Sequence, residues 1–237
     1  MESAGFVTLS RQSGLMREMR MVANNIANAA TTGYRQEGVI FSEFIRSAPN
    51  QSSLSMSQAH IRNTSMEQGS LTQTNGAFDF AIEGEGFFQV ETPAGVRLTR
   101  AGSFSLNADG DLVNLEGYRV LDAGGAPVFV PPDASDVSVS SDGTISTEGR
   151  LLGQIGLVHP SDPLSMTRED GVLFRVNDGV EPAENARVLQ GFVEGSNVNP
   201  ILQVARMIDI QRAYEMGQSF LETEDQRIRN AAKTLMK

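Results

Sequence analysis

One short stretch of the chain has the residue types and spacing of a calcium loop. Ser105, Asn107, Asp109, Gly110 and Glu116 match positions of an EF-hand loop, except that Ser replaces the first Asp. The flanking residues alternate as in strands, whereas an EF-hand loop lies between helices. An Asn-Ala-Asp-Gly-Asp hairpin turn explains the same residues. We therefore expect a turn and no metal here.

Other patterns for catalysis are weaker still. The run Gly84-Glu85-Gly86 begins like a dinucleotide loop, but Gln89 stands where the third glycine belongs and no helical pattern follows. The chain has no cysteine and only His60 and His159, so thiol and histidine chemistry are poorly supplied. The acidic residues leave a carboxylate-dependent glycan hydrolase open as an alternative, which turnover by a released monomer would favour. We predict no catalytic residue, no metal and no cofactor.

The charge of the chain lies mostly in its middle. Of a net charge of −10, residues 47–196 hold 8 Arg against 20 acids, whereas residues 1–46 hold 5 Arg against 4 Glu. Residues 197–237 hold 6 basic against 5 acidic side chains. Nucleic-acid binding needs a basic face, so we expect no nucleic-acid partner. The distribution indicates a solvated middle and associating ends.

The sequence also gives no sign of membrane insertion. Its apolar runs stay well short of the ~18–20 residues that a spanning helix needs. Residues 1–6 lack the basic start and apolar core of a cleavable signal peptide. We expect no direct membrane insertion and, for an exported protein, a route without signal cleavage.

Both ends predict amphipathic helices. Near the N-terminus, Leu15, Met19, Val22 and Ile26 recur at helical spacing, and Gly33 is a plausible stop. Near the C-terminus, Asn199-Pro200 is typical of a helix start. The seven-residue series that follows consists of Met207, Tyr214, Leu221, Ile228 and Leu235, with Ile210 and Gly217 three residues after members of it.

Between the helices the periodicity changes from helical to strand-like. From Phe78 onward apolar and polar residues alternate, which predicts an antiparallel β domain over 78–196. Residues 47–77 are rich in Ser, Gln, Asn and Thr, and we interpret them as an extended connector. Turn pairs recur through the β domain at Asp109-Gly110, Gly124-Gly125, Asp142-Gly143, Asp170-Gly171 and Asp178-Gly179.

The sequence therefore predicts an α+β protein in which long N- and C-terminal α-helices pair as a coiled coil beside a central antiparallel β domain. The assembly segments are 1–46 and 197–237. Two arrangements remain open at this stage, since the helices can pack against copies from neighbouring chains or form only an intramolecular hairpin on the flank of the β domain. In the first arrangement both helical stripes are the assembly interface.

Several polar or special residues beside the stripes are further candidates for that interface. A buried amide at a helical seam fixes register, which favours at least one of Asn24, Asn25 and Asn28 as an interface residue, with Asn25 and Asn28 as the candidates; the alternative is that all three face solvent. Tyr34 and Tyr214 could anchor contacts between chains or pack within one subunit. Gly217 costs helix propensity, so close backbone approach is a reason for it.

Three blocks of the sequence, in the same order, resemble the flagellar rod and hook proteins. The first is ANNIAN at 23–28 followed by TTGYR at 31–35. The second is FDFAIEGEGFF at 78–88 followed by TRAGSF at 99–104, and the third is EGSNVNP at 194–200 followed by QRAYE at 211–215. The blocks bracket nearly the whole chain. Within the family the start, residues 38–44 and the length are most similar to proximal rod subunits; a distal rod or another axial protein is the alternative.

The resemblance implies a structural role in bacterial motility. Such proteins pass unfolded through the flagellar type III export apparatus without signal cleavage. They assemble helically with copies of themselves and with other rod proteins, and the rod crosses the periplasm in the basal body and transmits torque. The family's terminal helices form a coiled coil along the inner tube, and its β domain faces outward.

Overall fold

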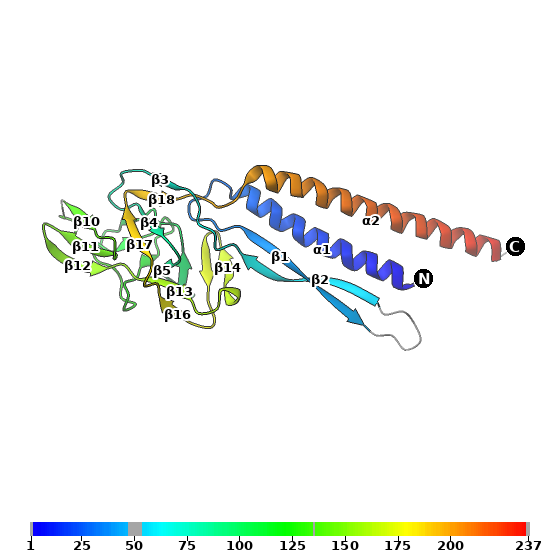
Figure 1. The fold of residues 1–237 in the computed structure, drawn as a ribbon, viewed down its shortest axis with the longest axis horizontal. Coiled ribbons are helices and arrows are strands. Elements are labelled where there is room, and N and C mark those ends of the chain that lie inside the picture. The colour runs from blue at the N-terminus through cyan, green and yellow to red at the C-terminus, as the bar shows by residue number, and fades with distance from the viewer. Residues whose placement is uncertain (1, 47–53, 135, 236–237) are drawn as a thin grey trace. The chain divides into compact units, whose positions relative to one another are not determined.

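The computed structural model describes residues 2–46, 54–134 and 136–235, and the chain divides into two compact units (Figure 1). We call them the helical unit, which comprises residues 1–27, 37–63 and 199–237, and the β unit, which comprises 28–36 and 64–198. An N-terminal helix, a central antiparallel β region and a C-terminal helix confirm the predicted α+β class.

Helix α1 (Glu2–Ala27) ends before the expected stop at Gly33. The Asn28 carbonyl accepts a hydrogen bond from the Thr31 N–H at 3.1 Å, and the Asn28 side chain accepts another from the Thr31 hydroxyl, so the chain turns there. Asparagine side chains compete with the helix for backbone groups in this way. Gly33 has the left-handed φ of +70° that the prediction assigned to it, but in a loop of the β unit.

Helix α2 (Pro200–Leu235) begins where the sequence predicted it. The Asn199 side chain accepts hydrogen bonds from the N–H groups of Ile201, at 3.1 Å, and Leu202, at 3.3 Å. These are backbone donors that the first turn leaves without helical partners, and Pro200 has no N–H to satisfy. The predicted cap is confirmed.

Strands β1 (Glu37–Arg46) and β2 (Leu54–Thr64) pair in a two-stranded sheet that belongs mainly to the helical unit. The prediction included residues 37–46 in the N-terminal assembly segment, after the expected helix stop at Gly33, and did not predict a strand there. The run Val39-Ile40-Phe41 is rich in the branched and aromatic side chains that favour strands, which accounts for β1. Residues 54–64 are extended as expected for the connector, and its residues 47–53 lie outside the described part.

The β unit consists of antiparallel strands. Its largest sheet runs in the order β14-β15-β6-β5-β9-β8-β7, and β13 joins β5 to β16. The strands of this sheet are β5 (Phe87–Thr92), β6 (Gly95–Thr99), β7 (Ser105–Leu106), β8 (Leu112–Val113), β9 (Arg119–Val120), β13 (Leu157–Pro160), β14 (Thr167–Asp170), β15 (Leu173–Arg175) and β16 (Val180–Pro182). The smaller sheets contain β10 (Val137–Val139), β11 (Thr144–Thr147) and β12 (Arg150–Gln154); β4 (Phe80–Glu83) and β17 (Arg187–Gln190); and β3 (Leu71–Gln73) and β18 (Phe192–Glu194), and η1 (Pro163–Ser165) is a short 3₁₀-helix.

The core of the β unit follows from the predicted strands and turns. Phe80, Ile82, Phe88 and Val90, which the alternation singled out, are all buried in one apolar cluster. The last glycine of each of the five predicted turn pairs has a positive φ, between +45° and +89°. Glycine adopts this conformation without the steric cost that other residues meet. Four of the five pairs also lie between segments that pair antiparallel, which confirms these hairpin turns. Asp178-Gly179 instead joins β15 to β16, which do not pair with each other.

The calcium-like loop is one of these hairpins. Strands β7 and β8 pair antiparallel, with Ser105 opposite Val113. The Asn107 side chain accepts hydrogen bonds from the N–H groups of Asp109, at 2.9 Å, and Asp111, at 2.8 Å. An Asn side chain that holds its own turn explains its position without a cation. Within the described residues, no group of three or more potential metal ligands comes together, and no helix is long and apolar enough to cross a membrane.

Candidate functional site

The first candidate site is the pair of helices in the helical unit. Helices α1 and α2 lie side by side and run in opposite directions (Figure 1). Glu18 on α1 accepts a hydrogen bond from Arg206 Nε on α2 at 2.7 Å, and Gln12 lies beside Gly217. These two contacts show that the helices are antiparallel, because the residue number falls along α1 from Glu18 to Gln12 as it rises along α2 from Arg206 to Gly217.

Most members of the predicted stripes lie on the covered faces of the two helices. Val22 and Ile210 are buried, and Leu15, Met19 and Ile26 on α1 are partly buried. On α2, Met207, Tyr214, Gly217 and Leu221 are partly buried, while most residues between them are exposed. Burial thus recurs at alternating steps of three and four residues, which is the spacing of a helical seam.

The end of the predicted stripe behaves differently. Ile228 is 56% exposed. Gln12 of α1 lies beside Gly217 of α2. Beyond this contact α1 continues for ten described residues, whereas Ile228 lies eleven residues farther along α2, so α2 extends past the described end of α1. The side chain of Leu235 lies outside the described residues. The far end of α2 therefore presents apolar side chains that α1 does not cover.

Asn25 is a buried amide of the helical unit, with 1% of its surface exposed. Its Nδ2 donates to the Glu37 carbonyl at 2.8 Å and to Gln203 Oε1 at 3.4 Å, and its Oδ1 accepts from the Glu37 N–H at 3.1 Å. One side chain therefore ties α1 to β1 and α2. Asn28 is partly buried and bonds to Thr31 within the chain.

The sequence analysis missed a second apolar surface on α2. Six large apolar side chains are at least 43% exposed on the first two-thirds of the helix. They are Ile201, Leu202, Val204, Ile208, Met216 and Phe220. They do not follow the seven-residue series, so a search for that spacing passes over them. We call this set the outer row.

A groove of about 330 Å³ lies between the two helices where the outer row meets the seam. Met216, Gly217 and Phe220 line it from α2, and Leu15 and Gln12 line it from α1. Gly217 has no side chain to fill this space. A Cβ placed there would meet Gln12 at an ordinary contact distance of 3.4 Å, so the helices do not require glycine at this position in order to pack.

The second candidate site is a buried ion cluster in the β unit. Glu194 Oε1 lies 2.9 Å from Arg35 Nη2, and Glu194 Oε2 lies 3.0 Å from Arg100 Nη1. The three side chains are at most 2% exposed. The Gly69 N–H also donates to Glu194 Oε1, at 2.9 Å. We call Arg35, Arg100 and Glu194 the ion triad.

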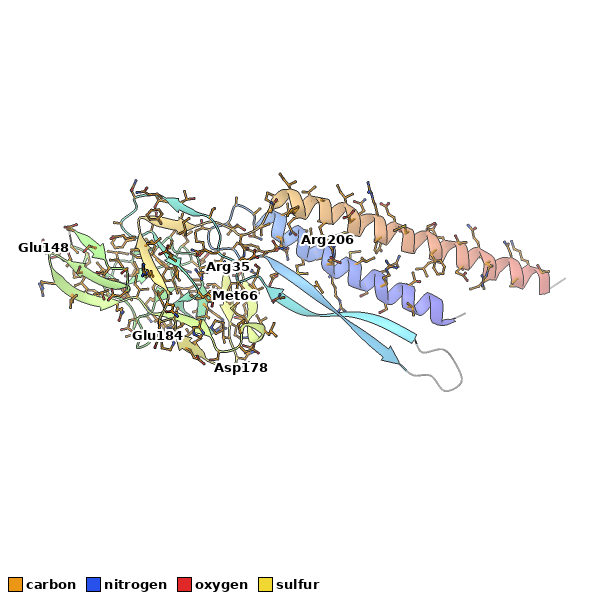
Figure 2. All side chains as sticks on the ribbon, in the orientation of Figure 1. Arg35, Met66, Glu148, Asp178, Glu184 and Arg206 are labelled. Atoms are coloured by element: carbon orange, nitrogen blue, oxygen red, sulfur yellow. The ribbon has the colours of Figure 1, made fainter. Side chains whose placement is uncertain are left out.

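The arginines have further partners around the triad. Arg100 donates to the carbonyls of Ile82 and Gly84. Arg35 donates weakly to the carbonyl of Met66 at 3.4 Å. Figure 2 labels Arg35 and Met66 in the β unit. Burial lowers the pKa of Arg100 to about 10, an effect that the nearby Glu194 opposes. Burial also lowers the pKa of Arg35. Arg100 still carries its charge at neutral pH, so the triad holds two cations against one anion.

Around the triad, backbone segments approach each other so closely that two glycines leave no space for a Cβ. The Gly33 N–H donates to the Glu194 carbonyl at 2.7 Å. A Cβ on Gly33 would lie 2.2 Å from the Ala101 nitrogen, and a Cβ on Gly69 would lie 2.0 Å from the Gly195 carbonyl oxygen. These separations are shorter than any non-bonded contact between such atoms. Both positions therefore require glycine.

Tyr34 is a predicted interface residue that the structure accounts for within the chain. It is 2% exposed and packs with Val172 and Val198. The Arg168 guanidinium lies over its ring at 4.2 Å, a cation–π arrangement, and also donates to the Arg35 carbonyl. Of the two roles considered for Tyr34, contact between chains or packing within one subunit, this environment agrees with packing within one subunit.

Family models match three parts of the chain. A model described as flagella basal body rod protein matches residues 7–35, and the D1 domain of flagellar hook protein FlgE/F/G matches 81–147. The C-terminal model of flagellar basal body rod FlgEFG protein matches 189–234. Each matched part supplies one member of the triad: Arg35, Arg100 and Glu194. Each of the three resembling blocks also contains one of them, so the order of the blocks is the sequence signal from which the triad could have been predicted.

Whole-length relatives agree with these matches. A flagellar basal-body rod protein FlgF of Mesorhizobium japonicum is 37% identical over 238 residues, which cover 99% of this chain and 98% of the relative. Another FlgF, of Caulobacter vibrioides, is 38% identical and covers 100% and 99%. A flagellar basal-body rod protein FlgG of Buchnera aphidicola is 31% identical over 91% of this chain and 93% of the relative.

Proposed function

The chain belongs to the family of flagellar basal-body rod proteins, and from that premise we propose how it serves as a subunit of the rod. It is a structural subunit of the flagellar basal body, of the type of its FlgF relatives. We place it in the proximal rod, where it assembles with copies of itself and with other rod proteins. It catalyses no reaction.

The outer row of α2 is the observation that carries the assembly proposal. Exposed apolar side chains lower the free energy by roughly 25 cal/mol for each Å² that a partner covers. Ile201 and Leu202 are 79% and 64% exposed in the first turn of α2, so they have most of their area left to bury. In the rod, helices of neighbouring subunits cover this row, and the contacts repeat head to tail as a helical array.

The interface predicted from the sequence divides into two roles in this proposal. Val22, Asn25, Ile210 and the partly buried stripe residues hold α1 against α2. Ile228, the outer row and the groove beside Gly217 meet neighbouring subunits. The terminal segments 1–46 and 197–237 then act together as a coiled-coil assembly module, with 47–77 as connector and 78–196 as the outward-facing domain.

The remaining parts of the proposal concern how the subunit reaches its place. The chain passes through the flagellar type III export apparatus without signal cleavage, and it joins the rod in the periplasm. The rod then transmits torque. The acidic middle of the chain supports an outward-facing, solvated position for the β unit, because like charge keeps such surfaces apart in solution.

Two exposed leucines give a matched test of the assembly surface. Leu202 lies in the outer row, whereas Leu151, 78% exposed, lies in β12 of the β unit. We expect Leu202→Arg to stop rod assembly and motility, because a charge in a covered apolar contact is costly. Leu151→Arg makes the same chemical change and should leave both intact. Swimming assays and purified basal bodies read the outcome, and intact rods containing Leu202→Arg would contradict the proposal.

A further inference from the structure

The ion triad joins two segments that lead out of the terminal helices. Arg35 lies in residues 28–36, which follow α1, and Glu194 lies in residues 191–198, which precede α2. Within the β unit both segments rest on Arg100, at the end of β6. We propose that the triad is a latch that makes the two segments dock on the β unit in one cooperative step. The inference goes beyond the role in the rod and does not depend on it.

The first argument is charge. Glu194 is the carboxylate that both arginines contact, at 2.9 and 3.0 Å, and all three groups are shielded from water. A state with residues 191–198 undocked would leave Arg35 and Arg100 buried without this anion, which charge strongly disfavours. A state with residues 28–36 undocked takes the Arg35 donor away from Glu194 Oε1 and leaves Arg100 and Glu194 as a pair. Charge therefore makes the docking of residues 28–36 depend on residues 191–198.

The second argument is that the two segments bond directly to each other. Gly33 donates to the Glu194 carbonyl, the Asn197 N–H donates to the Tyr34 carbonyl at 3.3 Å, and the Gln36 N–H donates to Asn197 Oδ1 at 2.6 Å. Residues 28–36 form no strand, so these bonds replace a ladder. If either segment leaves, the other loses these three bonds, while β18 keeps its pairing with β3.

The third argument is that neither docked segment supplies a side chain to the main core. The large apolar cluster and the side chains packed against it come from residues between 78 and 188, outside both 28–36 and 191–198. Strands β5 and β6 pair along five residues, from Phe88 opposite Thr99 to Thr92 opposite Gly95. The latch can therefore open while these strands remain paired, as local unfolding units do.

Hydrogen exchange on the full chain tests the latch. Glu194→Gln keeps the shape of the side chain and removes its charge. We expect the amides of Gly33, Gly69 and Asn197 to exchange together at least about tenfold faster, while Val90 and Leu98 in β5 and β6 keep the parent rates. Equal acceleration of β5 and β6 would identify Glu194 as an ordinary core residue and overturn the proposal.

Glu169→Gln is the matched control, because Glu169 also bridges two arginines, Arg97 and Arg175, but is 32% exposed. It should leave the exchange of Gly33 and Asn197 unchanged. A second variant, Arg35→Gln, covers the case in which Glu194→Gln fails to fold. It alters only the N-terminal side of the latch, so accelerated exchange at Gly195 and Asn197 is the result expected of coupling. Continued protection of both, with residues 28–36 released, would overturn it.

Discussion

At the residue scale, a few polar and glycine positions decide how this chain is fastened together. Asn25 was predicted from its place beside an apolar stripe, and the structure shows a buried amide. Its partners, Glu37 and Gln203, were beyond prediction, because one lies past a turn and the other is 178 residues away. The sequence indicates that a buried amide needs hydrogen-bond partners, but it does not show which groups provide them.

Asn25→Leu should destabilise the helical unit. The change leaves the Glu37 N–H and carbonyl without their buried partner, which costs about 1–3 kcal/mol. Thermal melts followed by circular dichroism would measure the loss. Asn24→Leu is the control, since Asn24 is exposed, and it should change stability by no more than about 0.5 kcal/mol. Equal effects of both would mean that burial of Asn25 has no energetic role.

Gly33→Ala and Gly117→Ala separate backbone strain from close packing. Both glycines have positive φ, +70° and +83°, so alanine costs about 1–2 kcal/mol at either position. Gly117 has nothing within 4 Å of a new Cβ, whereas at Gly33 the Ala101 nitrogen would be 2.2 Å away. We expect Gly33→Ala to lower the melting temperature of the β unit much further than Gly117→Ala. Similar losses would show that the loop around Gly33 relaxes freely.

At the element scale, local signals predicted some boundaries well and others poorly. The start of α2 depends on Asn199 and Pro200 alone, and the hairpins depend on glycines within the turn, so neighbouring residues suffice to predict them. The end of α1 depends instead on Asn28 closing a turn with Thr31. Strand β1 has a local signal in Val39, Ile40 and Phe41, but its partner β2 lies in the polar run that was predicted to be a connector. The pairing of these two strands was therefore missed.

Leu221→Arg should loosen the helix pair within the free chain. Leu221 is partly buried on the face of α2 that meets α1, so the guanidinium must either lose water or push the helices apart. We expect a loss of about 1–3 kcal/mol in the stability of the helical unit, and loss of motility. Ser219→Arg places the same side chain at an exposed position two residues earlier and should preserve the melting temperature. Equal melting of both variants would exclude Leu221 from the seam.

At the scale of the whole molecule, the split of charge anticipated two parts with different physical tasks. The neutral ends form most of the helical unit and the acidic middle forms most of the β unit. The exceptions are residues 54–63 of the middle, which lie in the helical unit, and residues 28–36 and 197–198 of the ends, which lie in the β unit. Composition could predict this division because it averages over many residues. It could not predict that residues 28–36 belong to the β unit, since that depends on contacts with residues far along the chain, such as Val172 and Glu194.

The β unit should fold without the terminal helices. Both of its larger apolar clusters are built from residues between 66 and 188, so a fragment of residues 64–198 contains them whole. We expect this fragment to be an acidic, β-rich monomer with a cooperative thermal transition by circular dichroism.

A fragment of residues 70–196 gives the sharper comparison. It keeps the large cluster but loses Gly69, whose N–H donates to Glu194, and Gln68, whose side chain donates to the Ile82 carbonyl at 2.8 Å. It should therefore fold with a lower melting temperature than the fragment 64–198. If neither fragment melts cooperatively, the β unit depends on the terminal segments for its fold. In that case docking of residues 28–36 precedes folding of the sheets, and the two-unit description of the chain fails.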